Sequence, residues 1–93
     1  MNINEVKKHN CEKDCWIIIN NYVYDVTSFI NDHPGGKQAI MTYAGRDGSE
    51  VFNKLHNEYV ITKYGINKGK IKILGRLNNK IINFLIKIIY NLC

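Results

Sequence analysis

The chain has 93 residues and a formal net charge of +5 at pH 7. This length allows one small domain with a modest hydrophobic core. Three cysteines without a disulfide framework, and a polar start with no secretory signal peptide, indicate a reducing compartment, so we expect a cytoplasmic protein.

Apolar runs separated by turn residues predict a mixed domain of short strands and short helices. We expect strands at 15–19 and 22–26, because the Asn20-Asn21 pair between two apolar runs is a hairpin signal, and a closing strand at 70–74. Short helices are expected at 4–8, 27–32, 37–43, 48–54 and 58–64, and Asp47 and Ser49 are candidate N-caps of the fourth. The predicted fold class is therefore α+β.

A histidine motif is the most informative feature of the chain. His33 is followed by Pro34, Gly35 and Gly36, and a second histidine, His56, follows 23 residues after the first. Pro34 disfavours helical backbone at the residue before it, and the two glycines permit a sharp turn and the close approach of a cofactor. Two imidazoles on opposing helix pairs can hold one flat cofactor from both sides.

Four ordered blocks between residues 4 and 75 resemble cytochrome b5 domains: 5–10, 14–19, 22–36 and 44–56. The resemblance implies a cytochrome b5-like fold, in which a small mixed sheet and two helix pairs enclose a haem. It also implies a b-type haem, iron protoporphyrin IX, with His33 and His56 as its axial metal ligands. The same match assigns the remaining cofactor-binding positions to Phe29, Pro34, Ile40, Phe52, Leu55, Val60 and Ile61.

The other histidine and the cysteines are expected to have structural roles. His9 lies in a polar run and is expected to be a surface residue or a satisfied core residue. Cys15, beside Trp16, is expected to be a small buried hydrophobe on its strand. The spacing of Cys11 and Cys15 matches neither a zinc ribbon nor the Cys-x-x-Cys-His motif of covalent haem attachment, so we expect a non-covalent haem.

Ligation of the iron by two histidines would determine whether the protein transfers electrons or acts on a substrate. With both axial positions filled by protein, no coordination site is left for oxygen or substrate, so an electron carrier is expected rather than an enzyme. The resemblance implies that it accepts electrons from a flavin-containing reductase and passes them to an acceptor oxidase such as a lipid desaturase or hydroxylase. The alternative is a regulatory module that binds haem or another ligand without electron turnover. The His-Pro-Gly-Gly motif favours the carrier.

The C-terminal segment carries the whole excess of positive charge. Residues 1–69 hold eight basic and eight acidic residues, whereas residues 70–93 hold five basic residues and no acidic one. We therefore divide the chain into a haem-binding domain, residues 1–75, and a basic amphipathic tail, residues 76–93. The apolar side chains of the tail share one helical face: Leu77, Ile81, Phe84, Leu85, Ile88 and Leu92.

This tail is predicted to form a helix that lies on a membrane surface. The 13 residues from Ile81 onward include Lys87 and are fewer than the ~20 needed to span a bilayer. Packing of the tail on the domain, pairing with another chain, and a truncated membrane anchor are the alternatives. A nucleic acid partner is not expected, because the bulky aliphatic content of the tail exceeds its basic content.

Overall fold

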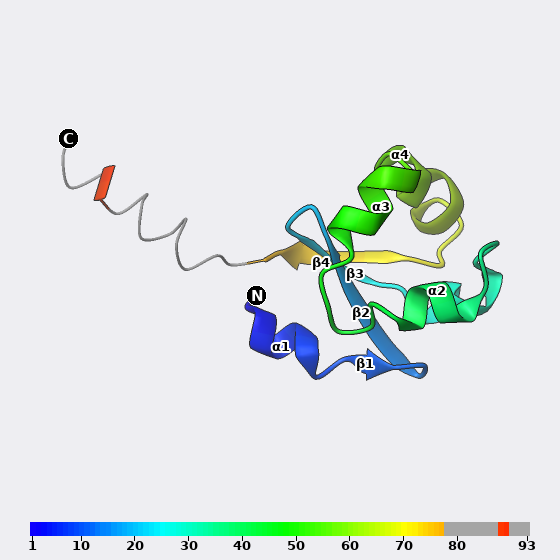
Figure 1. Cartoon of the computed structure of the whole chain (residues 1–93), viewed down its shortest axis with the longest axis horizontal. Helices are drawn as coiled ribbons and strands as arrows, with labels where there is room; N and C mark the ends of the chain where they lie inside the picture. Colours follow the sequence, from blue (N-terminus) through cyan, green and yellow to red (C-terminus); the bar gives the residue numbers. More distant parts are fainter. Residues whose placement is uncertain (78–87, 90–93) are drawn as a thin grey trace.

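The computed structural model describes residues 1–77 and 88–89 of the chain. Most of the predicted amphipathic tail, residues 76–93, lies outside the described residues. Within the described part, no helix combines the length and the hydropathy that a membrane crossing requires. Figure 1 shows the domain, in which α2, α3 and α4 gather around a small sheet and α1 lies near the N-terminus.

Four antiparallel strands form the sheet in the order β1-β2-β3-β4: Asn10–Cys11, Asp14–Ile19, Tyr22–Asp25 and Lys72–Arg76. Asn20 and Asn21, between β2 and β3, have φ angles of 52° and 69°, the left-handed backbone that a tight hairpin turn requires. The predicted hairpin and the closing strand are confirmed. The two-residue strand β1 was not predicted, because two residues show no alternation.

Helical segments occur at all five predicted places. They are α1 Ile3–Lys7, the 3-10 helix η1 Thr27–Asp32, α2 Lys37–Met41, α3 Ser49–Leu55, α4 Tyr59–Ile61 and the π-helical η2 Thr62–Ile66. The helix predicted at 58–64 is therefore divided in two. In η2 the buried Gly65 lies against the Ile71 side chain, where any larger residue would overlap it.

The prediction of an N-cap for α3 is wrong in its detail. Gly48 occupies the cap position and makes no side-chain cap bond. Ser49 is the first helical residue, and its Oγ accepts a hydrogen bond of 2.7 Å from the Asn20 N–H. Asp47 accepts one of 2.8 Å from the Ser49 N–H. Ser49 therefore ties α3 to the β2–β3 hairpin instead of capping its own helix.

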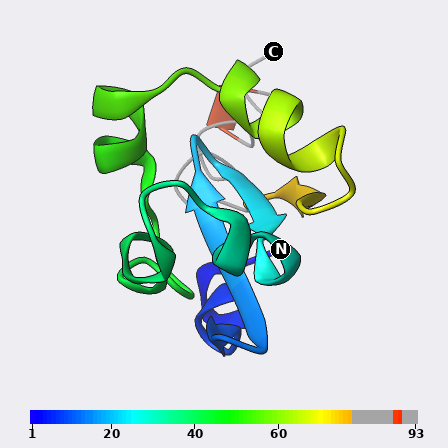
Figure 2. The ribbon, with the colours of Figure 1, turned by 90° about the vertical axis from the view of Figure 1, so that its right-hand side faces the viewer.

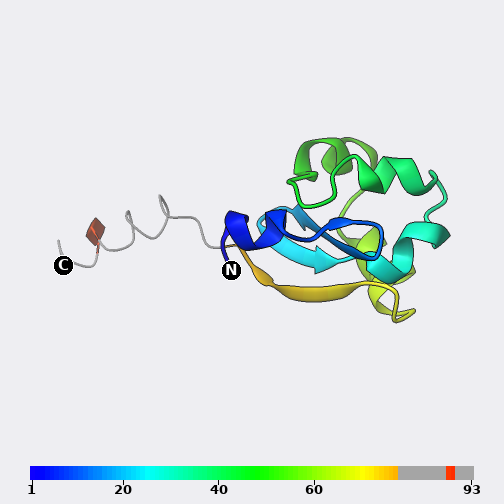
Figure 3. The same ribbon diagram turned by 90° about the horizontal axis from the view of Figure 1, so that it is seen from below.

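Two hydrophobic clusters lie on opposite faces of the sheet. Figure 3 shows the strands of this sheet from below. The α1-side cluster consists of Val6, Ile18 and Val23, with Met1, Trp16, Leu74 and Leu77 packed against it. The helix-side cluster consists of Cys15, Ile17, Tyr24, Val26, Ile30, Ile40, Ala44, Ile61 and Ile71. Neighbouring residues of β2 thus serve different clusters, as the alternation of a strand dictates.

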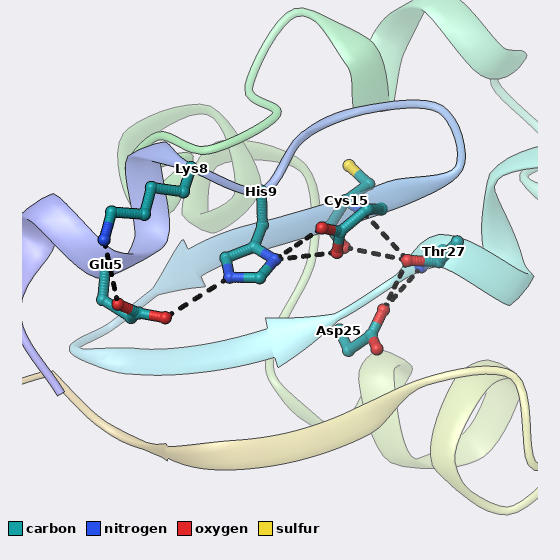
Figure 4. Close-up of polar contacts among 7 residues, drawn as sticks. Glu5, Lys8, His9, Cys15, Asp25 and Thr27 are labelled. Atoms are coloured by element: carbon teal, nitrogen blue, oxygen red, sulfur yellow. Dashed lines mark hydrogen bonds and ion pairs between the residues drawn. The ribbon is translucent and has the colours of Figure 1, made fainter.

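His9 fastens α1 to the sheet beside the α1-side cluster. Its Nδ1 lies 2.8 and 2.7 Å from the two carboxylate oxygens of Asp14, and its Nε2 lies 3.5 Å from a Glu5 oxygen (Figure 4). Its ring is stacked on Trp16 with a centroid distance of 3.5 Å. The prediction of a satisfied histidine is confirmed. The Asp14 carboxylate, aided by Glu5 and opposed by burial, raises the pKa of His9 above 6.5.

This arrangement makes the stability of the domain depend on pH. Because the pKa of His9 is raised in the folded state, its contribution to stability is fully present below pH 6.5 and is lost as the pH rises through the raised pKa. Urea unfolding between about pH 5.5 and pH 8.5 should show this loss in the natural chain. His9→Gln keeps His33 and His56 and should remove this component, so parallel profiles for the two proteins would contradict the role of His9.

Candidate functional site

The start of η1 is fixed to β2 by a short polar network around Thr27. The Thr27 Oγ1 accepts a hydrogen bond of 2.9 Å from the Cys15 N–H and donates one of 2.6 Å to Asp25, whose carboxylate also accepts the Thr27 N–H at 3.0 Å (Figure 4). Cys15 is fully buried, as predicted, and burial raises the pKa of its thiol to about 11. The thiol is therefore protonated at neutral pH and serves packing.

His33 stands where η1 ends. Its backbone is extended, with φ −70° and ψ 122°, as expected for a residue before Pro34. The His33 Nδ1 lies 3.0 Å from the Gly36 carbonyl oxygen. With Nδ1–H donating to that oxygen, the lone pair of Nε2 is free to bind a metal.

Gly35 allows this position of the imidazole. A Cβ atom at Gly35 would lie 2.8 Å from the His33 Cε1, closer than such atoms pack, and 3.3 Å from its Nδ1, so the imidazole would have to move. The Phe29 ring meets the imidazole edge to face, with centroids 5.8 Å apart. The glycine and the aromatic ring therefore border the His33 ring on two sides.

His56 has an equivalent place at the end of α3. Its N–H donates to the Phe52 carbonyl at 2.8 Å, and its backbone then becomes extended, with φ −144° and ψ 165°. The Phe52 ring lies 5.6 Å from the imidazole, centroid to centroid. Each histidine thus ends a helical segment and has a phenylalanine four residues before it.

The structure brings some of the remaining predicted residues together and leaves others apart. Ile40 and Ile61 are buried in the helix-side cluster, and Phe29 and Phe52 pack against it. Val60 is half-buried, whereas Pro34 is exposed and Leu55 exposes 69% of its surface. Figure 2 shows that the segments bearing these residues surround one end of the sheet.

These residues fit the haem that the resemblance implies. The donor set is two imidazoles, which are established iron ligands, and the ring of one is already oriented by a backbone carbonyl. The neighbouring side chains are aromatic and aliphatic, as the faces of a porphyrin require. Two open cavities of about 470 and 330 Å³ lie elsewhere, against residues 44–47 and along α3, and neither is lined by a histidine.

Two polar contacts that position this site are not predicted from the sequence. The Gly36 carbonyl holds the His33 ring, and the Asp25–Thr27 pair holds the start of η1. The second has a local signal, because an aspartate two residues before a threonine is typical of a turn bonded by its own side chain. The first has none, since it depends on the conformation of the turn.

Comparison with known proteins agrees with this geometry. A model of the family described as the cytochrome b5-like haem/steroid binding domain matches residues 2–83. L-lactate dehydrogenase (cytochrome) of Saccharomyces cerevisiae is 52% identical over 60 residues, which are 64% of this chain and 10% of that protein. Acyl-lipid (9-3)-desaturase of Physcomitrium patens is 52% identical over 54 residues, 58% of this chain and 10% of that protein. The chain thus spans about a tenth of these relatives.

A solved structure is similar along most of the chain. Cytochrome b5 of Ostreococcus tauri virus 2 matches with a TM-score of 0.74 and 45% identity, over 84% of this chain and 95% of that one. This match confirms the predicted cytochrome b5-like α+β fold. The prediction of a mixed sheet is wrong, because all neighbouring strands of the described sheet pair antiparallel.

Proposed function

The chain belongs to the cytochrome b5-like haem/steroid binding domain family, and we propose that it carries single electrons on a non-covalent haem b held by His33 and His56. The family binds haem, and electron transport is its characteristic activity. The observation that carries the proposal is the 3.0 Å contact between the His33 Nδ1 and the Gly36 carbonyl, because it leaves Nε2 for the iron.

The residues of the proposed site would have separate roles in holding the haem. Bound haem supplies one-electron exchange between ferric and ferrous iron. His33 and His56 would hold the metal from the ends of η1 and α3, and Phe29 and Phe52 would keep the two imidazoles in place. Ligation of the iron by both histidines would leave substrates no access to the metal, which suits a carrier rather than an enzyme. The other apolar positions would line the porphyrin: Pro34, Ile40, Leu55, Val60 and Ile61.

The proposed electron donor is a flavin-containing reductase, and the proposed acceptor is an oxidase such as a lipid desaturase or hydroxylase. The desaturase and lactate dehydrogenase relatives support this choice, since each combines a similar domain with an oxidoreductase. The charges near His33 support no strong preference for a basic partner. Asp32 is paired with Lys70 at 3.2 Å and Glu12 with Lys37 at 3.2 Å, so these acids are compensated.

Substitution of either ligand tests the site directly. His33→Ala and His56→Ala should each abolish the low-spin absorption spectrum of the haem protein, because each removes one axial ligand. His9→Ala is the matched control and should keep the spectrum, since His9 is bonded to Asp14 on the other face of the sheet. An unchanged spectrum in either ligand variant would disprove that ligand. If the natural chain shows no haem spectrum at all, the regulatory alternative replaces the carrier.

Gly35→Ala tests whether the position of the imidazole matters as well as its presence. The added methyl group would displace the His33 ring, so haem affinity should fall by about 10- to 100-fold, as is typical when the support of a metal ligand is disturbed. The rate of haem transfer to apomyoglobin measures this loss. Gly48→Ala is the control, because its φ is −104° and a Cβ atom there would make only ordinary contacts of 3.4 Å or more. Equal haem retention by the two variants would contradict the proposed constraint.

We also propose that residues 77–93 place the domain, residues 1–75, at the cytoplasmic surface of a membrane. The support is the sequence of the tail, in which an apolar face and basic residues occur without any acidic residue. The structure suggests where to cut the chain for a test. β4 continues to Arg76, and the Leu77 N–H donates to the Asn21 carbonyl at 2.7 Å, so a shortened chain should keep Leu77.

Removal of residues 78–93 should separate haem binding from membrane binding. The full chain should co-sediment with anionic vesicles, less with neutral ones, and less at high salt, because the electrostatic part of the attraction is screened. The chain ending at Leu77 should keep its haem spectrum and lose most of the sedimentation. The surface-helix proposal is wrong if the two chains sediment equally, or if the full chain resists extraction as an integral protein does.

A further inference from the structure

The basic residues of the chain are concentrated on one part of the domain itself. Residues 59–77 contain five of the 13 basic residues and none of the eight acidic ones. In the domain these residues belong to η2, to the turn after it and to β4, and η2 and β4 pack side by side (Figure 2). The basic residues concerned are Lys63, Lys68, Lys70, Lys72 and Arg76.

Most of these charges are not compensated by a carboxylate. Lys70 is paired with Asp32 at 3.2 Å. Within residues 1–77, Lys63, Lys68, Lys72 and Arg76 have no carboxylate oxygen within 4.0 Å. Among the described residues, four cations along η2, the turn and β4 therefore have no carboxylate partner.

Exposed apolar side chains lie among these cations. Tyr64 exposes 47% of its surface, and the Nζ atoms of Lys63 and Lys68 lie 5.2 and 5.8 Å from the centroid of its ring. Ile73, next to Lys72, exposes 54% of its surface. Because β4 is the edge strand of the sheet, side chains on both of its faces border the same edge. We call this surface the basic edge. It is formed by Lys63, Tyr64, Lys68, Lys72 and Ile73.

We propose that the basic edge contacts the headgroups of an anionic lipid bilayer, which extends the membrane contact proposed above from the tail to the folded domain. Lysines reach lipid phosphates and carboxylates, and a tyrosine ring suits the level of the headgroups. An acidic protein would also attract lysines. The bilayer is favoured because the chain passes from Arg76 directly into a segment rich in leucine and isoleucine that contains two lysines and no acidic residue.

This contact would fix the orientation of the haem site. η2 follows α4, which begins three residues after His56, so the bilayer would lie beside the part of the domain that carries His56. Lys70, which lies between Lys68 and Lys72, is paired at 3.2 Å with Asp32, the residue before His33, so the end of η1 also lies beside this segment. The basic edge would thus hold the haem site close to the membrane.

The test removes three charges from the basic edge of the full chain. Lys63→Gln, Lys68→Gln and Lys72→Gln together should weaken binding to vesicles of phosphatidylcholine and phosphatidylserine by about tenfold or more, since each lysine near an anionic surface adds to the attraction. The matched control is Lys7→Gln, Lys8→Gln and Lys13→Gln, which removes the same charge from three exposed lysines near the N-terminus. The control should lose about twofold or less.

Two results would overturn this proposal. Equal losses in the two triple variants would mean that net charge, and not the basic edge, governs binding. Weakened binding to poly-glutamate with unchanged binding to the vesicles would assign the surface to an acidic protein. The haem spectrum of the same samples reports on the proposed electron carrier independently, because none of the substituted lysines belongs to the proposed haem site. Both triple variants keep the tail, so a failure here is also distinct from a failure of the tail proposal.

Discussion

The alternation of side chains along β2 is the constraint on which the rest of the structure depends. Ile17 faces the helix-side cluster, and Ile18, its neighbour, faces the α1-side cluster. A register shift of one residue against β3 would turn both toward the wrong face, and the Asn20-Asn21 turn fixes that register. Cys15, two residues before Ile17, bonds Thr27 through its N–H, so the strand that separates the clusters also positions the segment leading to His33.

The two clusters have different borders, and only the border of the helix-side cluster lies against the two predicted haem ligands. Val6, Ile18 and Val23 are fully buried in the α1-side cluster, which α1 covers. The helix-side cluster is bordered by the partly buried rings of Phe29 and Phe52, and it is this border that carries the two histidines. A flat apolar cofactor bound there would add buried apolar surface to the helix-side cluster, so it would stabilise the fold as well as carry electrons.

The sequence predicts those features that depend on residues close together in the chain. The hairpin at Asn20 and the extended backbone of His33 follow from local chemistry, and both are found. The features it misses depend on contacts across the fold. The Ser49 hydroxyl accepts the Asn20 N–H, 29 residues away, and the π-helical turn of η2 accompanies the packing of Gly65 on a strand residue. Local propensity cannot report such contacts, because both partners must first be placed by the sheet.

The acidic and the basic residues of the domain occupy different parts of the chain. In the fold, this separation makes the charge of the surface uneven. All eight acidic residues precede Tyr59, and the acid nearest to His33, Asp32, is compensated by Lys70 from the basic segment. The surroundings of His33 are therefore close to neutral, whereas the basic edge keeps its charge. Near a charged surface, a charge distribution of this kind affects the orientation of the domain more than the overall strength of its attraction. Because screening acts over about 10 Å at 0.1 M salt, this orientation would be set close to a charged surface, where electron transfer requires it.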